Sequence, residues 1–203
     1  YPNVTNEGSW VSIKGMRHPI IETLKQDTLY IPHNIELTKD TPGRLIFGVN
    51  SSGKSSLMKA VGISVILAQA GLPVPAKSMN LGIYKSMFAR IVGNDNIFKG
   101  MSTFAVEASE LARIMKSSDE HSLVLGDELC SGTEQNGAEA IVAGSILKLL
   151  ERNVSFVFAT HLHRLRLIPD LASHPKLGWS HLRVECTEDG KLQMHRTLED
   201  GPG

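Results

Sequence analysis

The sequence predicts an α/β fold with a mostly parallel central sheet flanked by helices and with an additional antiparallel β part. Apolar runs of strand length lie at 44–47, 122–126 and 154–159, and helical patterns at 57–70 and 134–152 alternate with them. Nearly every residue within these strand runs is apolar, whereas a strand with one wet face alternates apolar and polar residues. Continuous apolarity in strands that alternate with helices therefore indicates a parallel sheet buried on both faces.

The amino-terminal part of the chain is expected to be β-rich. Short β-like runs lie at 10–13, 28–31 and 35–37, and glycine and proline residues interrupt them. We expect the whole chain to form a single domain, with a β-rich leading segment at 1–40 and the α/β core at 41–203.

Further elements complete this pattern. A strand is expected at 86–92, followed by a mobile polar loop at 93–100 and a helix at 103–116. An antiparallel hairpin is expected near the end of the chain, with strands at 182–187 and 192–195 joined through an Asp-Gly turn.

Length and composition are those of an ordinary globular protein. The chain has 203 residues, of which 41% are hydrophobic and 21% charged, so a full apolar core can form. It contains no apolar run of the length that spans a membrane. Its beginning at Tyr1 has neither a starting Met nor the pattern of a signal peptide. We expect a fragment of a longer intracellular protein.

Charge and cysteine content exclude some partners. Twenty-one basic and 21 acidic residues give a formal net charge of zero, so a nucleic-acid surface would have to come from other segments. Cys130 and Cys186 are too few and too far apart for a zinc cluster or a disulfide framework. Both are expected to be reduced and to pack as small core residues.

A glycine loop is the strongest chemical signal. The segment from Gly48 to Ser55 reads Gly-Val-Asn-Ser-Ser-Gly-Lys-Ser and lies between an expected strand and an expected helix. This spacing is typical of loops whose backbone N–H groups hold nucleotide phosphates at a helix N-terminus. Lys54 is expected to reach the β- and γ-phosphates, and the Ser55 hydroxyl to bind Mg²⁺. The segment predicts binding of ATP or GTP.

Two adjacent carboxylates form the second signal. Asp127 and Glu128 end the apolar run at 122–126, and ligands in open α/β sheets lie at the carboxyl ends of the strands. We expect Asp127 to hold Mg²⁺, directly or through water, and Glu128 to act as the general base of hydrolysis. The alternative is a solvated acidic turn.

The third signal is Thr160-His161, which follows the run at 154–159. His161 at the end of a neighbouring strand can approach the γ-phosphate and orient water. Its alternative role is a surface histidine at the start of a basic helix, and His163 is expected to be such a surface residue.

These segments together resemble the ATPase domain of the MutS family of DNA mismatch-repair proteins. Their order and spacing agree with that family over nearly the whole chain. The residues that carry the resemblance are Arg17-His18-Pro19, Tyr30 to Asn34, Gly48 to Ser55, Ser102 to Phe104 with Glu107, Asp127 to Thr133, and Thr160-His161.

The resemblance implies roles for further residues. An aromatic residue at the place of Tyr30 stacks on the adenine, Asn50, Ser51, Ser52, Gly53 and Ser56 belong to the phosphate-binding segment, and Ser102 approaches the γ-phosphate of a partner subunit's nucleotide. Tyr30 could instead be a plain strand aromatic, and Ser102 a helix cap.

The resemblance also implies cofactors and partners. ATP or ADP with Mg²⁺ would be held between two domains of a homodimer, and nucleotide state would be coupled to the clamping of DNA. DNA would be bound by domains outside this chain, and a MutL-like repair protein would be a further partner. Location in the cytoplasm or nucleoid is expected, or in an organelle or a viral factory for a divergent member.

Several departures and alternatives accompany the resemblance. The family's loop more often reads Gly-Pro-Asn-Met-Gly-Gly-Lys-Ser, whereas Val49, Ser51 and Ser52 stand here, which is similar to divergent viral and organellar members. The alternatives are an ATPase of cassette transporters or chromosome maintenance, a nucleotide-binding module without hydrolysis, and a small-molecule kinase. The transporter-type signature Leu-Ser-Gly-Gly-Gln and an arginine-rich lid are both missing from the sequence.

Overall fold

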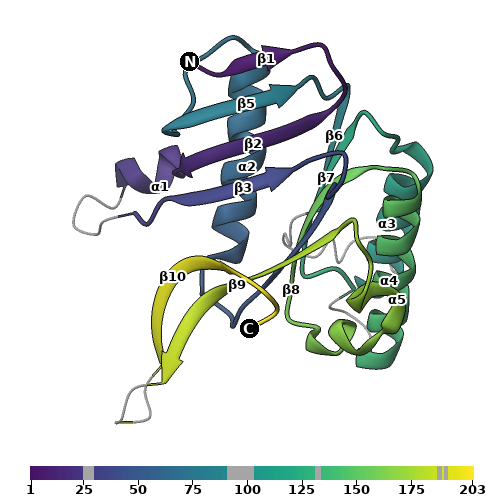
Figure 1. Ribbon diagram of the computed structural model, residues 1–203. Helices are drawn as coiled ribbons and strands as arrows, with labels where there is room; N and C mark the ends of the chain where they lie inside the picture. The colour runs from purple at the N-terminus through teal and green to yellow at the C-terminus, as the bar shows by residue number, and fades with distance from the viewer. Residues whose placement is uncertain (25–29, 91–102, 131–133, 187–188, 190–191) are drawn as a thin grey trace.

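Two β-sheets and a set of helices make up the part of the chain that the computed structural model describes, residues 1–24, 30–90, 103–130, 134–186, 189 and 192–203 (Figure 1). The larger sheet has six strands in the order β10-β9-β4-β8-β7-β6. Neighbouring strands run parallel except β9 and β10, which are antiparallel. The strands are β4 (Gly43–Phe47), β6 (Ser86–Arg90), β7 (Ser122–Asp127), β8 (Ser155–Thr160), β9 (Leu177–Cys186) and β10 (Leu192–Asp200).

The smaller sheet has four strands in the order β1-β5-β2-β3. Its strands are β1 (Asn3–Thr5), β2 (Trp10–Met16), β3 (His33–Leu37) and β5 (Ser78–Gly82). β5 pairs with both β1 and β2, so the leading segment at 1–40 does not form this sheet alone. A strand from the later part of the chain completes it.

Helices cover the larger sheet on both faces. α2 lies between the two sheets, and α3, α4 and α5 lie on the opposite side of the larger sheet (Figure 1). The helical segments are α1 (Pro19–Leu24), α2 (Lys54–Gln69), α3 (Thr103–Ser117), α4 (Gln135–Glu151), the 3₁₀ helix η2 (His163–Leu167) and α5 (Pro169–Ala172).

Side chains of the central strands point alternately into two cores. Leu45 and Phe47 belong to the core beneath α3 and α4, whereas Ile46 belongs to the core around α2. The same alternation occurs in β7 and β8. Both faces of these strands therefore lie against apolar side chains, which explains why their sequences are apolar without interruption. The predicted α/β class is confirmed.

The strand predicted at 28–31 is wrong for the residues that the structure describes. Tyr30 and Ile31 are not in a strand, and β3 begins only at His33. Pro32 has no backbone N–H to donate to a neighbouring strand, so ladder pairing can start only after it. Residues 28–29 lie outside the described residues.

Other differences from the prediction are a longer β9 and several short elements. β9 begins at Leu177 because it pairs in parallel with β4 from Gly43 onward. β1, β5, α1, η2 and α5 were not predicted; they are short or carry polar residues that weaken the apolar pattern. Residues 91–92 of the expected strand and the expected loop at 93–100 lie outside the described residues. No described helix combines the length and apolarity that crossing a lipid bilayer requires.

Gly43 provides a test of how closely β4 packs. A Cβ atom at Gly43 would lie 2.3 Å from Cζ of Phe156 and 3.0 Å from Cδ2 of Leu150, and both side chains are fully buried. We expect Gly43→Ala to lower the free energy of unfolding by about 1–3 kcal/mol, measured by urea denaturation.

Gly144 is the matched control for this substitution. It is exposed within α4, and a Cβ atom there would meet nothing within 4 Å. Gly144→Ala should leave stability unchanged or raise it by up to about 1 kcal/mol, because alanine favours the helix. Equal effects of the two substitutions would contradict the packing at Gly43.

Candidate functional site

The glycine loop (48–55) connects β4 to α2 and wraps around a buried lysine amine. Nζ of Lys54 donates hydrogen bonds to the carbonyl oxygens of Gly48 (2.6 Å) and Val49 (3.1 Å). The Lys54 side chain is only 4% exposed. The amine is therefore held inside the loop by the loop's own backbone.

Two glycines permit this loop shape. A Cβ atom at Gly48 would lie 2.7 Å from Oγ of Ser52, and Gly53 has a φ of 109°, which side chains disfavour. Gly53 is the residue before the first turn of α2, and no side chain caps this helix end. The first N–H groups of α2 therefore have no capping side chain, and they lie beside the glycine loop.

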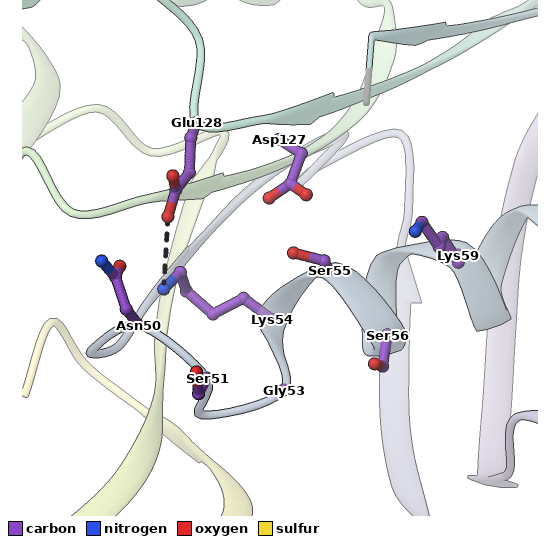
Figure 2. Close-up of a pocket in the computed structure, with 9 residues that line it drawn as sticks. All are labelled: Asn50, Ser51, Gly53, Lys54, Ser55, Ser56, Lys59, Asp127 and Glu128. Atoms are coloured by element: carbon purple, nitrogen blue, oxygen red, sulfur yellow. Dashed lines mark ion pairs between the residues drawn. The ribbon is translucent and has the colours of Figure 1, made fainter. Parts of the chain in front are cut away.

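The acidic tip, Asp127 and Glu128, reaches the same place from β7. Parallel pairing sets Asp127 of β7 opposite Ala159 of β8, and Thr160 opposite Phe47 of β4. Because the carboxyl ends of these strands lie at one edge of the sheet, the acidic tip faces the glycine loop. Oε1 of Glu128 lies 3.8 Å from Nζ of Lys54 (Figure 2).

Backbone geometry at Glu128 directs its carboxylate. Glu128 has a φ of 47°, an uncommon left-handed conformation for a residue with a side chain. Its N–H donates to the carbonyl oxygen of Ala159 at 2.9 Å, which fixes the turn after β7. Such unfavourable backbone conformations concentrate at functional sites.

The glycine loop and the acidic tip line one cavity of about 340 Å³. Figure 2 shows the Ser55 hydroxyl and the Asp127 carboxylate facing each other across it. The lining residues are Asn50, Ser51, Gly53, Lys54, Ser55, Ser56, Lys59, Asp127 and Glu128. Most of the residues predicted to bind phosphate and metal are thus brought together.

Charges in the cavity are opposed and partly desolvated. Burial lowers the pKa of Lys54 from its ordinary value, and the nearby carboxylates of Glu128 and Asp127 counteract this effect. Asp127 is 5% exposed, and its Oδ1 has no hydrogen-bond partner among the described residues. A buried carboxylate oxygen without a partner, opposite a hydroxyl, is a suitable place for a hard cation.

His161 lies at the rim of this site. Its Nδ1 is 3.9 Å from Oε1 of Glu128, and its side chain is 51% exposed. It does not line the cavity itself. Its position after β8 agrees with the prediction, although its distance from Glu128 exceeds that of a hydrogen bond.

Four other predicted residues do not line the cavity or cannot be placed, and the first of them is Gly48, which lies at the start of the loop. Ser52 is a buried residue of the loop, its backbone N–H donates to the Val49 carbonyl oxygen, and it does not line the cavity. The Tyr30 ring packs edge-on against His33 with ring centroids 6.0 Å apart, and Tyr30 does not line the cavity. Ser102 lies outside the described residues, as do residues 131–133.

Lys59 is a cavity residue that the sequence reasoning missed. It is exposed on α2 and lines the cavity with Ser55. Residues four apart lie on the same face of a helix, so its spacing from Ser55 could have revealed it.

The two cysteines differ from each other. Cys130 is buried, as predicted, and has a φ of 61°. Cys186 is exposed, so the prediction of a core residue is wrong for it. It is the last residue of β9 and pairs with Leu192 at the start of β10.

Comparison with known proteins identifies the family. The family model described as MutS domain V matches residues 44–203. The chain belongs to the MutS family. Both the glycine loop and the acidic tip lie within the part of the chain that this MutS model matches.

Individual relatives agree with this assignment. A mitochondrial DNA mismatch repair protein mutS homolog of Sarcophyton glaucum is 40% identical over 96% of this chain and 19% of its own length. A putative DNA mismatch repair protein mutS homolog of Acanthamoeba polyphaga mimivirus is 36% identical over 100% of this chain and 21% of its own. DNA mismatch repair protein MutS of Lactococcus lactis subsp. cremoris is 36% identical over 99% of this chain and 24% of its own length. The chain thus spans about a fifth to a quarter of the length of these relatives.

His33 packs against Tyr30, and its burial is expected to make the stability of the fold depend on pH. Burial lowers its pKa from 6.5 to about 4, and its Nδ1 has no partner among the described residues. As pH falls from 6.5 to about 4, the unfolded chain takes up a proton at this residue that the folded chain does not. The free energy of unfolding should therefore fall by about 3 kcal/mol from this residue alone.

His33→Phe removes this titration while keeping an aromatic ring. In urea denaturation at both ends of this pH range, the variant should lose less stability on acidification than the wild type. Equal losses would show that His33 is not the source.

Proposed function

We propose that this chain is the ATP-binding and ATP-hydrolysing domain of a MutS-like DNA mismatch-repair protein. In fold terms it would be a phosphate-binding-loop NTPase of the cassette type. The observation that carries the proposal is the cavity in which Lys54 and the start of α2 face Asp127 and Glu128. A cavity with a cation and helix N–H groups on one wall and carboxylates on the other suits a triphosphate together with a metal ion.

The glycine loop would hold the phosphates. Asn50, Ser51 and Gly53 line the cavity, and Ser56 lies in the first turn of α2. Lys54 would exchange its hydrogen bonds to the loop carbonyls for the β- and γ-phosphates. Ser52, which is buried, would support the loop rather than touch the nucleotide through its side chain. Gly48 would supply the close turn.

Ser55 and Asp127 would hold Mg²⁺. The unpartnered Oδ1 of Asp127 and the hydroxyl of Ser55 would supply oxygen ligands, which this ion prefers. When bound, Mg²⁺ would neutralise phosphate charge during the reaction.

Glu128 would act as the general base. A water molecule between its carboxylate and the γ-phosphate would lose a proton to Glu128 and attack the γ-phosphorus. The bond from this phosphorus to the bridging oxygen then breaks, which releases ADP and phosphate. His161, beside Glu128, would orient that water. In this isolated chain we expect hydrolysis to be slow.

Tyr30 and Ser102 would complete the nucleotide site. Tyr30 would stack on the adenine, and Ser102 would act on the nucleotide of a partner subunit, so that ATP joins two copies of the domain. Nucleotide state would then control dimer geometry and, through other domains of the protein, the clamping of mismatched DNA. A MutL-like protein would be a further partner. The names of the mitochondrial and viral relatives are compatible with an organelle or a virus as the location.

Lys54→Ala tests nucleotide binding. Loss of the buried charge should weaken ATP binding by about 2–3 kcal/mol, measured by calorimetry. Lys148→Ala is the control, because Lys148 is half-exposed on α4 and pairs with Glu151, and it should leave the affinity unchanged. An unchanged affinity in Lys54→Ala would contradict the proposed site.

Glu128→Gln separates hydrolysis from binding. The amide keeps the size of the side chain but cannot accept the proton, so phosphate release should fall about 100-fold or more. Binding of ATP should persist. If wild type and Glu128→Gln release phosphate at equal rates, a nucleotide-binding module without hydrolysis would be the better description.

A further inference from the structure

A stack of three rings includes Phe47, the residue directly before the glycine loop. The Phe47 ring, directly before Gly48, is stacked on Trp179 with centroids 5.7 Å apart and planes 7° apart. The His163 imidazole packs on Phe47 with centroids 5.4 Å apart and planes 31° apart. Phe47 is 1% exposed, whereas His163 is exposed, as predicted, so its imidazole covers a core ring from the surface. The stack connects β4 and β9 to the start of η2.

The same histidine ends the turn that carries His161. The N–H of His163 donates to the carbonyl oxygen of His161 at 2.9 Å. Leu162 between them has φ −77° and ψ 75°, which are the angles of an inverse γ-turn. On the other side, Oγ1 of Thr160 accepts a hydrogen bond from the Leu162 N–H at 3.0 Å. The backbone of His161 is thus held from both sides.

The His161 side chain needs such support. It is 51% exposed, and its Nδ1 lies 3.9 Å from Glu128, too far for a hydrogen bond that would fix it. Its location relative to Glu128 therefore depends on where the turn places its Cα atom.

The charge state of His163 favours the stack. Burial, followed by the positive charges of Arg166, His161 and Lys54, lowers the pKa of His163 below its ordinary value. A neutral imidazole packs against an apolar ring without the desolvation cost of a cation.

We propose that His163 is a positioning residue, whose ring on Phe47 fixes the turn at 160–163 and thereby sets His161 against Glu128 beside the glycine loop. The positioning itself depends only on the fold, and its effect on turnover rests on the proposed function. Neither the family match nor the motif at Thr160-His161 assigns this role to His163.

The first test is independent of activity. In the 203-residue chain, the NMR ring resonances of His161 should shift when Glu128 is replaced by Gln, because the two side chains are neighbours. In a His163→Ala background this shift should largely disappear, whereas a His163→Phe background should keep it, because phenylalanine preserves the stack. An undiminished shift in His163→Ala, with its fold verified by circular dichroism, would overturn the proposal.

The second test uses turnover of ATP. His163→Ala should lower kcat about tenfold with little change in KM, since a misplaced group slows the chemical step, and His163→Phe should restore the rate. In a His161→Ala background, His163→Ala should cause almost no further loss. An equally large loss in that background, or no rescue by Phe, would overturn the proposal. If the wild type hydrolyses no ATP, the proposed function fails, and the NMR test still decides the role of His163.

Discussion

The parallel register of β4, β8 and β7 is the constraint on which the rest of the site depends. It places Phe47, Thr160 and Asp127 at one edge of the sheet, so the three segments that follow these residues emerge side by side. The buried Lys54 amine joins two of them, through the loop carbonyls and the Glu128 carboxylate. The site is thus assembled from three segments that are spread over residues 48–161 of the chain.

Most of the larger sheet could be predicted because its strands are buried on both faces, which leaves a continuous apolar signal in the sequence. The smaller sheet could not be predicted in the same way. β5 alternates buried Met79 and Leu81 with polar residues, and its place between β1 and β2 depends on long-range pairing that no local pattern records. Pro32 has no backbone N–H to donate, and β3 accordingly begins only at His33, later than the β-like run at 28–31 indicates.

In the candidate site, too, features that are local in the sequence could be predicted and features that depend on tertiary contacts could not. The spacing of the glycine loop and the position of Asp127 after an apolar run are local features, and the cavity contains both. The burial of Ser52, the contact of Tyr30 with His33 and the packing of His163 on Phe47 are tertiary features. His163 is exposed, as its place among arginines predicts, but nothing nearby in the chain indicates that a phenylalanine over a hundred residues earlier lies under its ring.

The position of α2 between the two sheets has a mechanical consequence. Its first turn borders the cavity, and its buried side chains pack in one core with β2, β3 and β5 on one side and β7 and β8 on the other. Protein interiors are too dense for such a helix to move independently of its neighbours. A tilt of α2 would therefore carry the four-stranded sheet with it, so that a change at the cavity would also displace the outer surface of that sheet.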